Sequence, residues 1–214
     1  MPTLEQLLLL APPILIALTV HEFAHAYIAN RLGDPTAKMM GRLTLNPLKH
    51  LDPLGTLLLF LVNFGWAKPV PVNPQYFRDP KRDMLLVALA GPVSNIILAF
   101  IAGITLRALS IDASPSEGAF ALFKLMVRYS LFINLVLAFF NLIPIPPLDG
   151  SKILRSLLPD SMLEAFLRFE QYGPFVLLGL ILLGRFTGVS ILWTLIGPFV
   201  DFFSELFGGI AARM

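Results

Sequence analysis

The stretch ALTVHEFAHAYIAN, residues 17–30, decides how this chain folds. It places two histidines, a glutamate and an asparagine inside a long run of leucine, isoleucine, valine and alanine. The run extends from residue 4 to residue 31, enough for a membrane-spanning helix, which needs about 20 apolar residues. Inserting an ionisable side chain into the bilayer within a span costs about 2.5–3.5 kcal/mol, unless the side chain is paired or has a function. We therefore expect an all-α membrane protein in which His21, Glu22 and His25 have a function.

The composition of the whole chain also indicates an integral membrane protein. Of its 214 residues, 56% are hydrophobic and 14% are charged, and the mean hydropathy is +0.76, which is more apolar than a soluble domain. Because the chain has no cysteine, thiolate metal sites are excluded and any metal must bind histidines and carboxylates. The net charge of +2 is small, and basic residues cluster in loops, so no nucleic-acid partner is expected.

Further apolar runs predict a polytopic fold. Residues 84–108 and 121–143 are two clear spans. Residues 172–207 predict a final hairpin of two helices, the first of them short. Residues 51–65 are apolar but too short to cross a bilayer, so we expect a re-entrant segment there.

The distribution of charge predicts the orientation of these spans. Basic residues flank the predicted re-entrant segment and lie again between the later spans, whereas the loop at residues 110–118 carries acidic residues and no lysine or arginine. Cytoplasmic loops are enriched in lysine and arginine. The pattern therefore predicts an N-terminus outside, with loops 31–83 and 144–171 in the cytoplasm.

The pattern HEFAH at residues 21–25 predicts a zinc site. Histidines four residues apart share one face of a helix, at the spacing that lets two imidazoles bind one Zn²⁺. Glu22 beside them can act as general base on water that the metal acidifies. A chance match, in which the polar residues satisfy one another between helices, is the alternative. Two of only three histidines in the chain fall in this motif, which favours the metal.

Catalytic zinc takes three protein ligands, so a third must come from elsewhere. NLIPIPPLDGSKIL, residues 141–154, begins where a predicted span returns to the cytoplasmic side, at the depth of His21, and it contains Asp149. Its prolines prevent a regular helix, and irregular backbone at membrane depth is tolerated only inside protein or along a water-filled cavity. The matching depth favours Asp149 as third ligand over a helix N-cap or an ordinary Asp-Gly turn.

Three motifs together carry a resemblance to a known family. HEFAH at residues 21–25, AGPVSN at 90–95 and NLIPIPPLDG at 141–150 resemble the hallmarks of the site-2 protease family of intramembrane zinc metalloproteases, in the same order and at similar separations. The resemblance covers roughly residues 14–156. Pairing HExxH with a proline-rich LDG motif inside a membrane protein is far more specific than either motif alone.

The resemblance implies roles for the residues already selected. His21, His25 and Asp149 would bind one catalytic zinc ion, with Glu22 as the base. The motifs would lie on a catalytic core of three helices, followed by C-terminal helices. Asn141 and Asn95 would lie near the substrate backbone, and interhelical hydrogen bonding is the alternative for both.

WAKPVPVNPQYF, residues 66–77, resembles the family's membrane-associated β-hairpin beside the active site. Alternating valine and proline favour extended backbone, and proline is confined to edge strands. Pro69, Val70, Pro71 and Val72 could therefore offer a free edge to an unwound substrate segment. A plain proline-rich surface loop is the alternative.

The third histidine, His50, adjoins the predicted re-entrant segment. We favour a structural role, such as capping a helix or bonding Asp52, over a regulatory metal contact.

The extent of the resemblance sets the expected domain organisation. We expect one membrane-embedded domain over residues 1–214, with a core at 1–156 and a C-terminal helical region at 157–214. The chain shows neither the extra N-terminal helix of some relatives nor a PDZ-like insertion. It is similar to the minimal, prokaryotic-type branch, whose substrate selection would rest on the membrane core or on a partner protein.

The sequence thus predicts an intramembrane zinc endopeptidase that cleaves peptide bonds in or near transmembrane segments. Regulated proteolysis and clearance of membrane proteins or signal peptides are the expected uses. The expected location is a prokaryotic inner membrane, with the active site near the cytoplasmic side, and the expected partners are a transmembrane substrate and the lipid bilayer. Three histidines are too few for a di-iron desaturase. A metal or proton transporter, or an inactive relative that only binds partners, is the remaining alternative, and Glu22 argues against transport.

Overall fold

The computed structural model describes residues 4–55, 65–110, 118–188 and 190–212. These residues are mostly helical, and among them no β-strand forms; one isolated antiparallel bridge joins Leu51 and Ala67. The described part of the chain therefore confirms the predicted all-α class. In chain order its elements are α1 Leu4–Arg31, α2 Thr36–Met39, η1 Pro47–Lys49, η2 Pro74–Tyr76, α4 Pro80–Ala108, α5 Gly118–Asn141, α6 Asp149–Leu157, α7 Asp160–Thr187, α8 Ile191–Gly208 and η3 Gly209–Ala212.

Local sequence sets the ends of the long helices. α1 is followed by Gly33, whose φ of 109° lies in the left-handed region that glycine adopts without strain. α4 begins after Asp79, whose side chain accepts a hydrogen bond from the backbone N–H of Arg82 and so caps the helix. α7 ends before Gly188, which has a φ of 74°.

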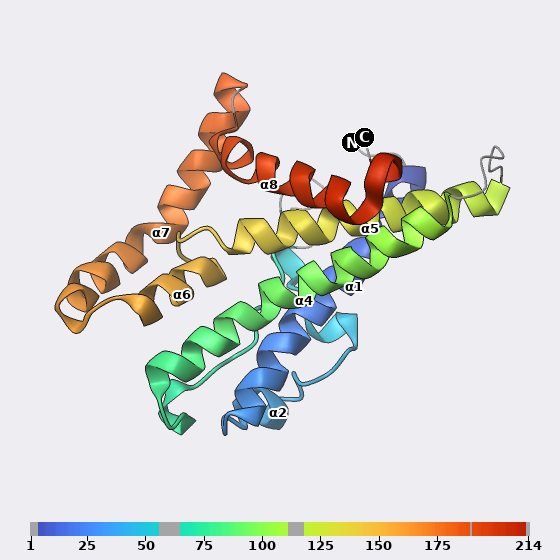
Figure 1. The fold of residues 1–214 in the computed structure, drawn as a ribbon. Helices are drawn as coiled ribbons and strands as arrows, with labels where there is room; N and C mark the ends of the chain where they lie inside the picture. The colour runs from blue at the N-terminus through green and yellow to red at the C-terminus, as the bar shows by residue number, and fades with distance from the viewer. Residues whose placement is uncertain (1–3, 56–64, 111–117, 189, 213–214) are drawn as a thin grey trace.

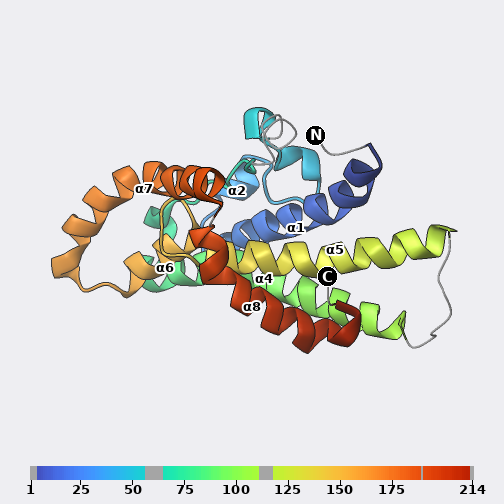
Figure 2. The ribbon, with the colours of Figure 1, turned by 90° about the horizontal axis from the view of Figure 1, so that it is seen from above.

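Helices α1, α4 and α5 form the centre of the molecule, and each contacts the other two (Figures 1 and 2). The spans predicted at residues 4–31, 84–108 and 121–143 correspond to these three helices. In lipid, helices associate chiefly through close packing, which small residues permit. Fully buried alanines supply such residues on all three helices: Ala17, Ala26, Ala29, Ala88, Ala99 and Ala138.

Five of the described helices, α1, α4, α5, α7 and α8, are long and apolar enough to cross a membrane. Large apolar side chains cover their outer surfaces; Ile97 and Ile101 on α4 are each 54% exposed, and Phe186 on α7 is 84% exposed. Such surfaces are stable against hydrocarbon and costly against water. The protein is therefore an integral, multi-pass membrane protein.

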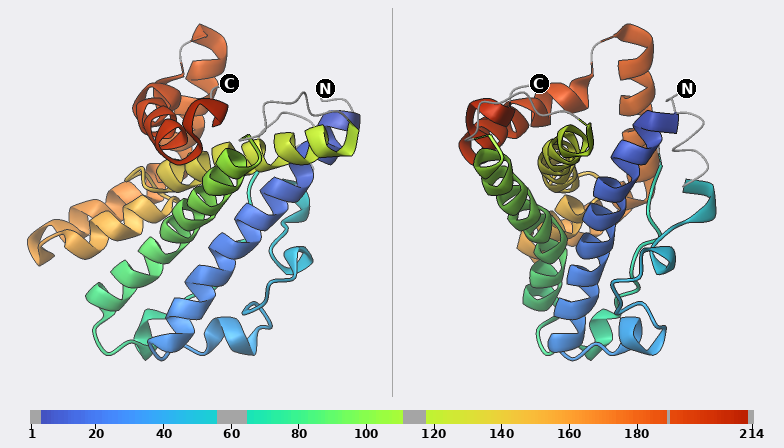
Figure 3. Two further views of the ribbon diagram at one scale, coloured as in Figure 1. Left: turned by 45° about the vertical axis from the view of Figure 1, so that its right-hand side comes forward. Right: turned by 90° about the vertical axis from the view of Figure 1, so that its right-hand side faces the viewer.

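The C-terminal region contains the two helices predicted within residues 172–207, but their arrangement differs from a hairpin with a short first helix. α7 has 28 residues, because it begins at Asp160, before the predicted apolar run, and continues through Gly184 and Arg185 to Thr187. α7 and α8 diverge from their junction (Figures 1 and 3). The end of α8 lies at the end of α4, where the Arg107 guanidinium donates to the carbonyl oxygen of Leu206. α8 thus runs in the same direction as α4.

Two predictions concern the segment between α1 and α4. Most of the predicted re-entrant segment at residues 51–65 lies outside the described residues. The predicted β-hairpin at residues 66–77 was wrong for the described chain, in which Ala67 forms only the bridge to Leu51 and η2 occupies Pro74–Tyr76. Three prolines within twelve residues remove the N–H donors that a strand ladder requires.

Packing of α4 against the end of α8 can be tested at Gly103. A Cβ atom there would lie 2.6 Å from Cβ of Phe207, so Gly103→Val should destabilise the protein by about 1–3 kcal/mol through overpacking. Gly179→Val on α7 is the matched control, because a Cβ at Gly179 meets nothing within 4 Å. Thermal unfolding in detergent measures both, and equal losses would contradict the observed position of α8.

Candidate metal centre

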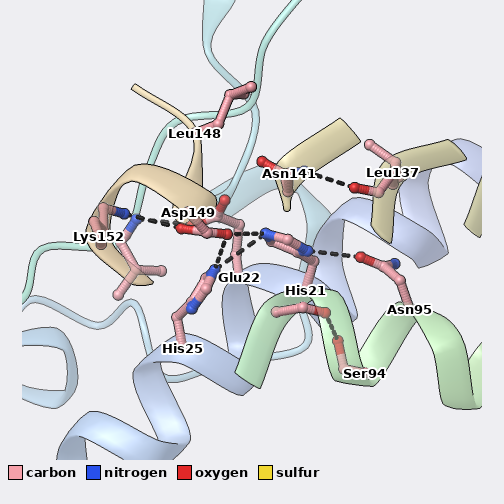
Figure 4. Close-up of polar contacts among 12 residues, drawn as sticks. His21, Glu22, His25, Ser94, Asn95, Leu137, Asn141, Leu148, Asp149 and Lys152 are labelled. Carbon is pink, nitrogen blue, oxygen red and sulfur yellow. Dashed lines mark hydrogen bonds and ion pairs between the residues drawn. The ribbon is translucent and has the colours of Figure 1, made fainter. Parts of the chain in front are cut away.

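His21 and His25 lie on one face of α1, as their spacing predicts, and point toward α6 (Figure 4). The ring centroids are 4.7 Å apart, and the two Nε2 atoms are 3.0 Å apart. Both side chains are buried. One helical turn therefore brings two imidazole nitrogens to a single point inside the protein.

Asp149 reaches the same point from the other side. It is the first residue of α6, and its Oδ2 atom lies 3.1 Å from Nε2 of His21 and 3.0 Å from Nε2 of His25. Asp149 is separated from His25 by 124 positions in the chain. The structure thus brings together the three residues that the sequence selected as metal ligands, and they form a group able to hold a metal ion.

The hydrogen bonds at the two Nδ1 atoms determine which nitrogen of each imidazole carries the hydrogen. Nδ1 of His25 lies 2.7 Å from the carbonyl oxygen of Val87, which can only accept, so Nδ1 carries the hydrogen. Nδ1 of His21 lies 2.6 Å from Oδ1 of Asn95. The Asn95 amide nitrogen donates to the carbonyl of Ala17, so its oxygen faces His21. Both Nδ1 atoms therefore donate, and in the neutral imidazoles both Nε2 atoms present lone pairs.

This donor set fits zinc. With neutral imidazoles, two Nε2 lone pairs and a carboxylate oxygen converge, and a bound cation stabilises such an arrangement. Tetrahedral zinc with bonds of about 2.0–2.1 Å separates its ligand atoms by about 3.3 Å, close to the 3.0–3.1 Å observed. Histidines that bind metals also donate the other ring N–H to an oxygen, as both do here.

The second oxygen of Asp149 is bonded to Lys152, with a distance of 3.0 Å from Oδ1 to Nζ. The ammonium group of Lys152 beside this oxygen favours the charged form of the Asp149 carboxyl group. The carboxylate is therefore ionised. Lys152 leaves Oδ2 directed at the two histidines.

Glu22 lies beside the donors with only 9% of its surface exposed. Its Oε2 atom accepts a hydrogen bond of 2.8 Å from the backbone N–H of Val70. This contact places the segment that includes Pro69, Val70, Pro71 and Val72 against the predicted base.

Buried residues fix both ends of that segment. The Arg42 guanidinium donates to the carbonyl of Lys68 over 2.7 Å, and the N–H of Lys68 donates to the carbonyl of His50 over 2.8 Å. Asp34 accepts from the N–H of Asn73 over 2.7 Å.

His50 is 1% exposed, and its Nε2 atom lies 2.8 Å from the carbonyl oxygen of Thr44. Asp52 instead accepts from the N–H of Gly55, so the expected bond between His50 and Asp52 does not form.

A cavity of about 620 Å³ adjoins the metal centre. Pro69, Val70, Val72 and Asn141 line it, whereas Pro71 and Asn95 are not among its lining residues. The Asn141 amide nitrogen is bonded to the carbonyl of Leu137. Asn95 is 0% exposed and lies behind His21, so the predicted position near a substrate backbone does not match its place in the structure.

The sequence did not reveal the contribution of α7 to this cavity. Pro174, Leu177, Leu178 and Ile181 line one wall, so the cavity extends beyond the predicted core at residues 1–156. The i, i+3, i+4, i+7 spacing of these residues marks one face of a helix. This spacing was the only feature of the sequence that could have indicated a packed face on α7. That pattern could not indicate which element the face approaches.

The close approach of α4 to the histidines depends on Gly91. A Cβ atom at this position would lie 2.6 Å from Nε2 of His21, inside the space that the ligand atoms occupy. The AGPVSN motif therefore serves the site twice, through the missing side chain of Gly91 and through the amide of Asn95.

Comparison with known proteins identifies relatives of this chain. The model of Peptidase family M50 matches residues 107–183. Two relatives have names beginning "Putative zinc metalloprotease": YwhC of Bacillus subtilis, 42% identical over 92% of this chain and 90% of its own length, and Rip2 of Mycobacterium tuberculosis H37Rv, 33% identical over 81% of this chain and 66% of its own. Zinc metalloprotease MJ0392 of Methanocaldococcus jannaschii is 25% identical over 90% of this chain and 47% of its own length. No solved structure matches with significant similarity.

Membrane helices around two histidines, an aspartate and an adjacent glutamate define a membrane metallopeptidase. The relatives identify the peptidase family, since this chain is 42% identical to YwhC over nine tenths of the length of YwhC. The chain belongs to peptidase family M50. The resemblance to the site-2 protease family is confirmed, and the family implies zinc as the metal.

Gly91→Ala should lower the affinity for zinc by about tenfold or more, because the added methyl group displaces the His21 imidazole. Gly179→Ala is the matched control, since a Cβ at that helical glycine meets nothing within 4 Å. Competition with a chromophoric chelator in detergent measures the affinity. Wild-type affinity in Gly91→Ala would show that α4 does not confine the ligands.

Proposed function

We propose that this protein is an intramembrane zinc endopeptidase that cleaves peptide bonds within or near transmembrane segments of other membrane proteins. The observation that carries the proposal is the convergence of His21, His25 and Asp149 beside Glu22, at a cavity walled by candidate membrane helices. We propose these three as the zinc ligands and Glu22 as the base.

The proposed chemistry assigns each step to a residue at the cavity. Zinc, when bound, supplies Lewis-acid chemistry by polarising a carbonyl oxygen and acidifying water. Glu22 accepts the proton of the attacking water and later delivers it to the leaving amine. The Val70 N–H holds the Glu22 carboxylate in place. Asn141, which also lines the cavity, is proposed to contact the substrate backbone.

The cavity wall supports an apolar substrate. Leu18, Val87, Phe140, Leu177 and Leu178 are among its lining residues, and apolar surfaces favour the side chains of a transmembrane segment.

The segment beside Glu22 is proposed to contact the extended part of the substrate. Pro69 and Pro71 have no N–H, and the N–H of Val70 is bonded to Glu22. The edge that this segment offers must therefore rely mainly on carbonyl oxygens, which accept hydrogen bonds from the substrate backbone.

We further propose that the site lies near the cytoplasmic face of a prokaryotic inner membrane. The metal centre is closer to the C-terminal end of α1 than to its N-terminal end, and basic residues gather where α1 ends and α4 begins: Arg31, Lys38, Arg78, Lys81 and Arg82. Basic loops favour the cytoplasm. Regulated intramembrane proteolysis and clearance of membrane proteins are the uses that this location supports.

Transport of metal ions or protons, and binding without catalysis, are the competing functions. The contact between Glu22 and the segment at Val70 argues against both, because it holds a base beside the ligands. The cavity beside the ligands also leaves room for a peptide.

Glu22→Gln should retain zinc and reduce cleavage of a single-span substrate by about 10²–10⁴-fold, because the amide cannot take a proton from water. Zinc content and cleavage rate are measured on the same purified sample. Glu164→Gln, on the exposed part of α7, is the matched control and should leave both unchanged. Cleavage by Glu22→Gln at the wild-type rate would rule out the proposed base.

Asp149→Ala should lower the affinity for zinc at least about 100-fold, since losing a ligand costs more than losing an outer hydrogen-bond partner. Asp160→Ala removes an exposed carboxylate that pairs with Lys81 and should leave zinc affinity unchanged. Chelator competition measures both variants. Full retention of zinc by Asp149→Ala would remove it from the ligand set.

A further inference from the structure

Asn134 is a buried polar residue on α5 that neither the sequence motifs nor the proposed chemistry uses. It is 0% exposed, as are Asn95 on the neighbouring α4 and Leu135 beside it in the chain. Polar side chains within spans are costly unless they are paired. Its hydrogen bonds therefore account for its presence, and they lead to the metal centre.

The partners of Asn134 give its amide a defined direction. Its Nδ2 atom donates to the carbonyl oxygen of Ser130 over 2.8 Å, and its Oδ1 atom accepts from Nδ2 of Asn95 over 2.8 Å. The Ser130 carbonyl can only accept. Exchanging the oxygen and nitrogen of Asn134 would therefore set two acceptors against each other.

The amide of Asn95 transmits this direction to His21. Asn95 Nδ2 donates to Oδ1 of Asn134 and, over 3.2 Å, to the carbonyl of Ala17. Its Oδ1 atom then has to face Nδ1 of His21, 2.6 Å away. His21 must donate from Nδ1, so its neutral form carries the lone pair on Nε2, which is 3.1 Å from Oδ2 of Asp149.

We infer that Asn134 is a positioning residue for the metal centre: through Asn95 it fixes the tautomer and orientation of His21. A chain of three hydrogen bonds runs from the backbone of α5 through α4 to a ligand on α1. The inference rests on the proposed role of His21 as a zinc ligand, and it adds α5 to the elements that prepare the site.

A purely structural role is the competing explanation, because asparagines commonly hydrogen-bond between membrane helices. The two explanations differ in the chemical property that a variant must retain at position 134. Positioning requires an acceptor oxygen facing Asn95. A structural role requires only that the variant protein be stable.

Two substitutions at position 134 separate these requirements. Asn134→Leu has similar size and suits an apolar interior, but it removes the acceptor. Asn134→Asp keeps an acceptor oxygen and introduces an ionisable group, which is destabilising within a span. Positioning predicts that Asn134→Leu weakens zinc binding about tenfold, whereas Asn134→Asp stays within about threefold of wild type. Structural support predicts that zinc affinity follows stability instead.

The experiment measures zinc dissociation constants by chelator competition, and thermal unfolding of the zinc-free protein, for wild type and both variants in detergent. Ser130→Ala is the matched control, because it removes a hydroxyl near Asn134 Nδ2 but keeps the carbonyl that orients it. This control should bind zinc as wild type does.

A double-variant cycle keeps the test decisive if Asn134→Asp does not fold. Because Asn134 acts through Asn95, adding Asn134→Leu to Asn95→Leu should weaken zinc binding no further than Asn95→Leu does. Additive losses, or wild-type zinc affinity in Asn134→Leu, would overturn the inference. Failure of the wild-type protein to bind zinc at all would instead contradict the proposed function.

Discussion

The structure depends on one constraint: three lone pairs must be held together inside an apolar membrane protein. Nε2 of His21, Nε2 of His25 and Oδ2 of Asp149 lie 3.0–3.1 Å apart. With neutral imidazoles such convergence calls for a cation, and surroundings of low polarity strengthen the attraction between that cation and its ligands. The protein must therefore fix each donor through its other atoms. A carbonyl holds one imidazole, the Asn95 amide holds the other, and Lys152 holds the second carboxylate oxygen.

The packing of the central helices follows from the same constraint. Helix α4 can lie against the histidines of α1 only because Gly91 has no side chain. Close approach of helices is also the main source of association in lipid, so the absence of a side chain at Gly91 both brings α4 close to α1 and leaves room for the metal. The hydrogen bonds from Ser130 through Asn134 and Asn95 connect the third helix to the same centre.

The cavity beside the metal is assembled from parts of the chain that no single motif contains. Glu22 comes from α1, its hydrogen-bond donor Val70 from the segment before α4, and Leu177 from α7. Buried contacts at Arg42 and Asp34 hold the segment that carries Val70.

Sequence by itself determined the membrane class, the three core helices and the set of His21, His25 and Asp149. Those conclusions rest on hydropathy and on the i, i+4 geometry of a helix, which can be read along one segment, and on matching the depths of two segments in the bilayer. The β-hairpin prediction failed because an extended pattern does not specify a pairing partner. Only the tertiary structure decided that Asn95 supports His21 and that α7 closes the cavity, because both depend on which helix faces cross far apart in the chain.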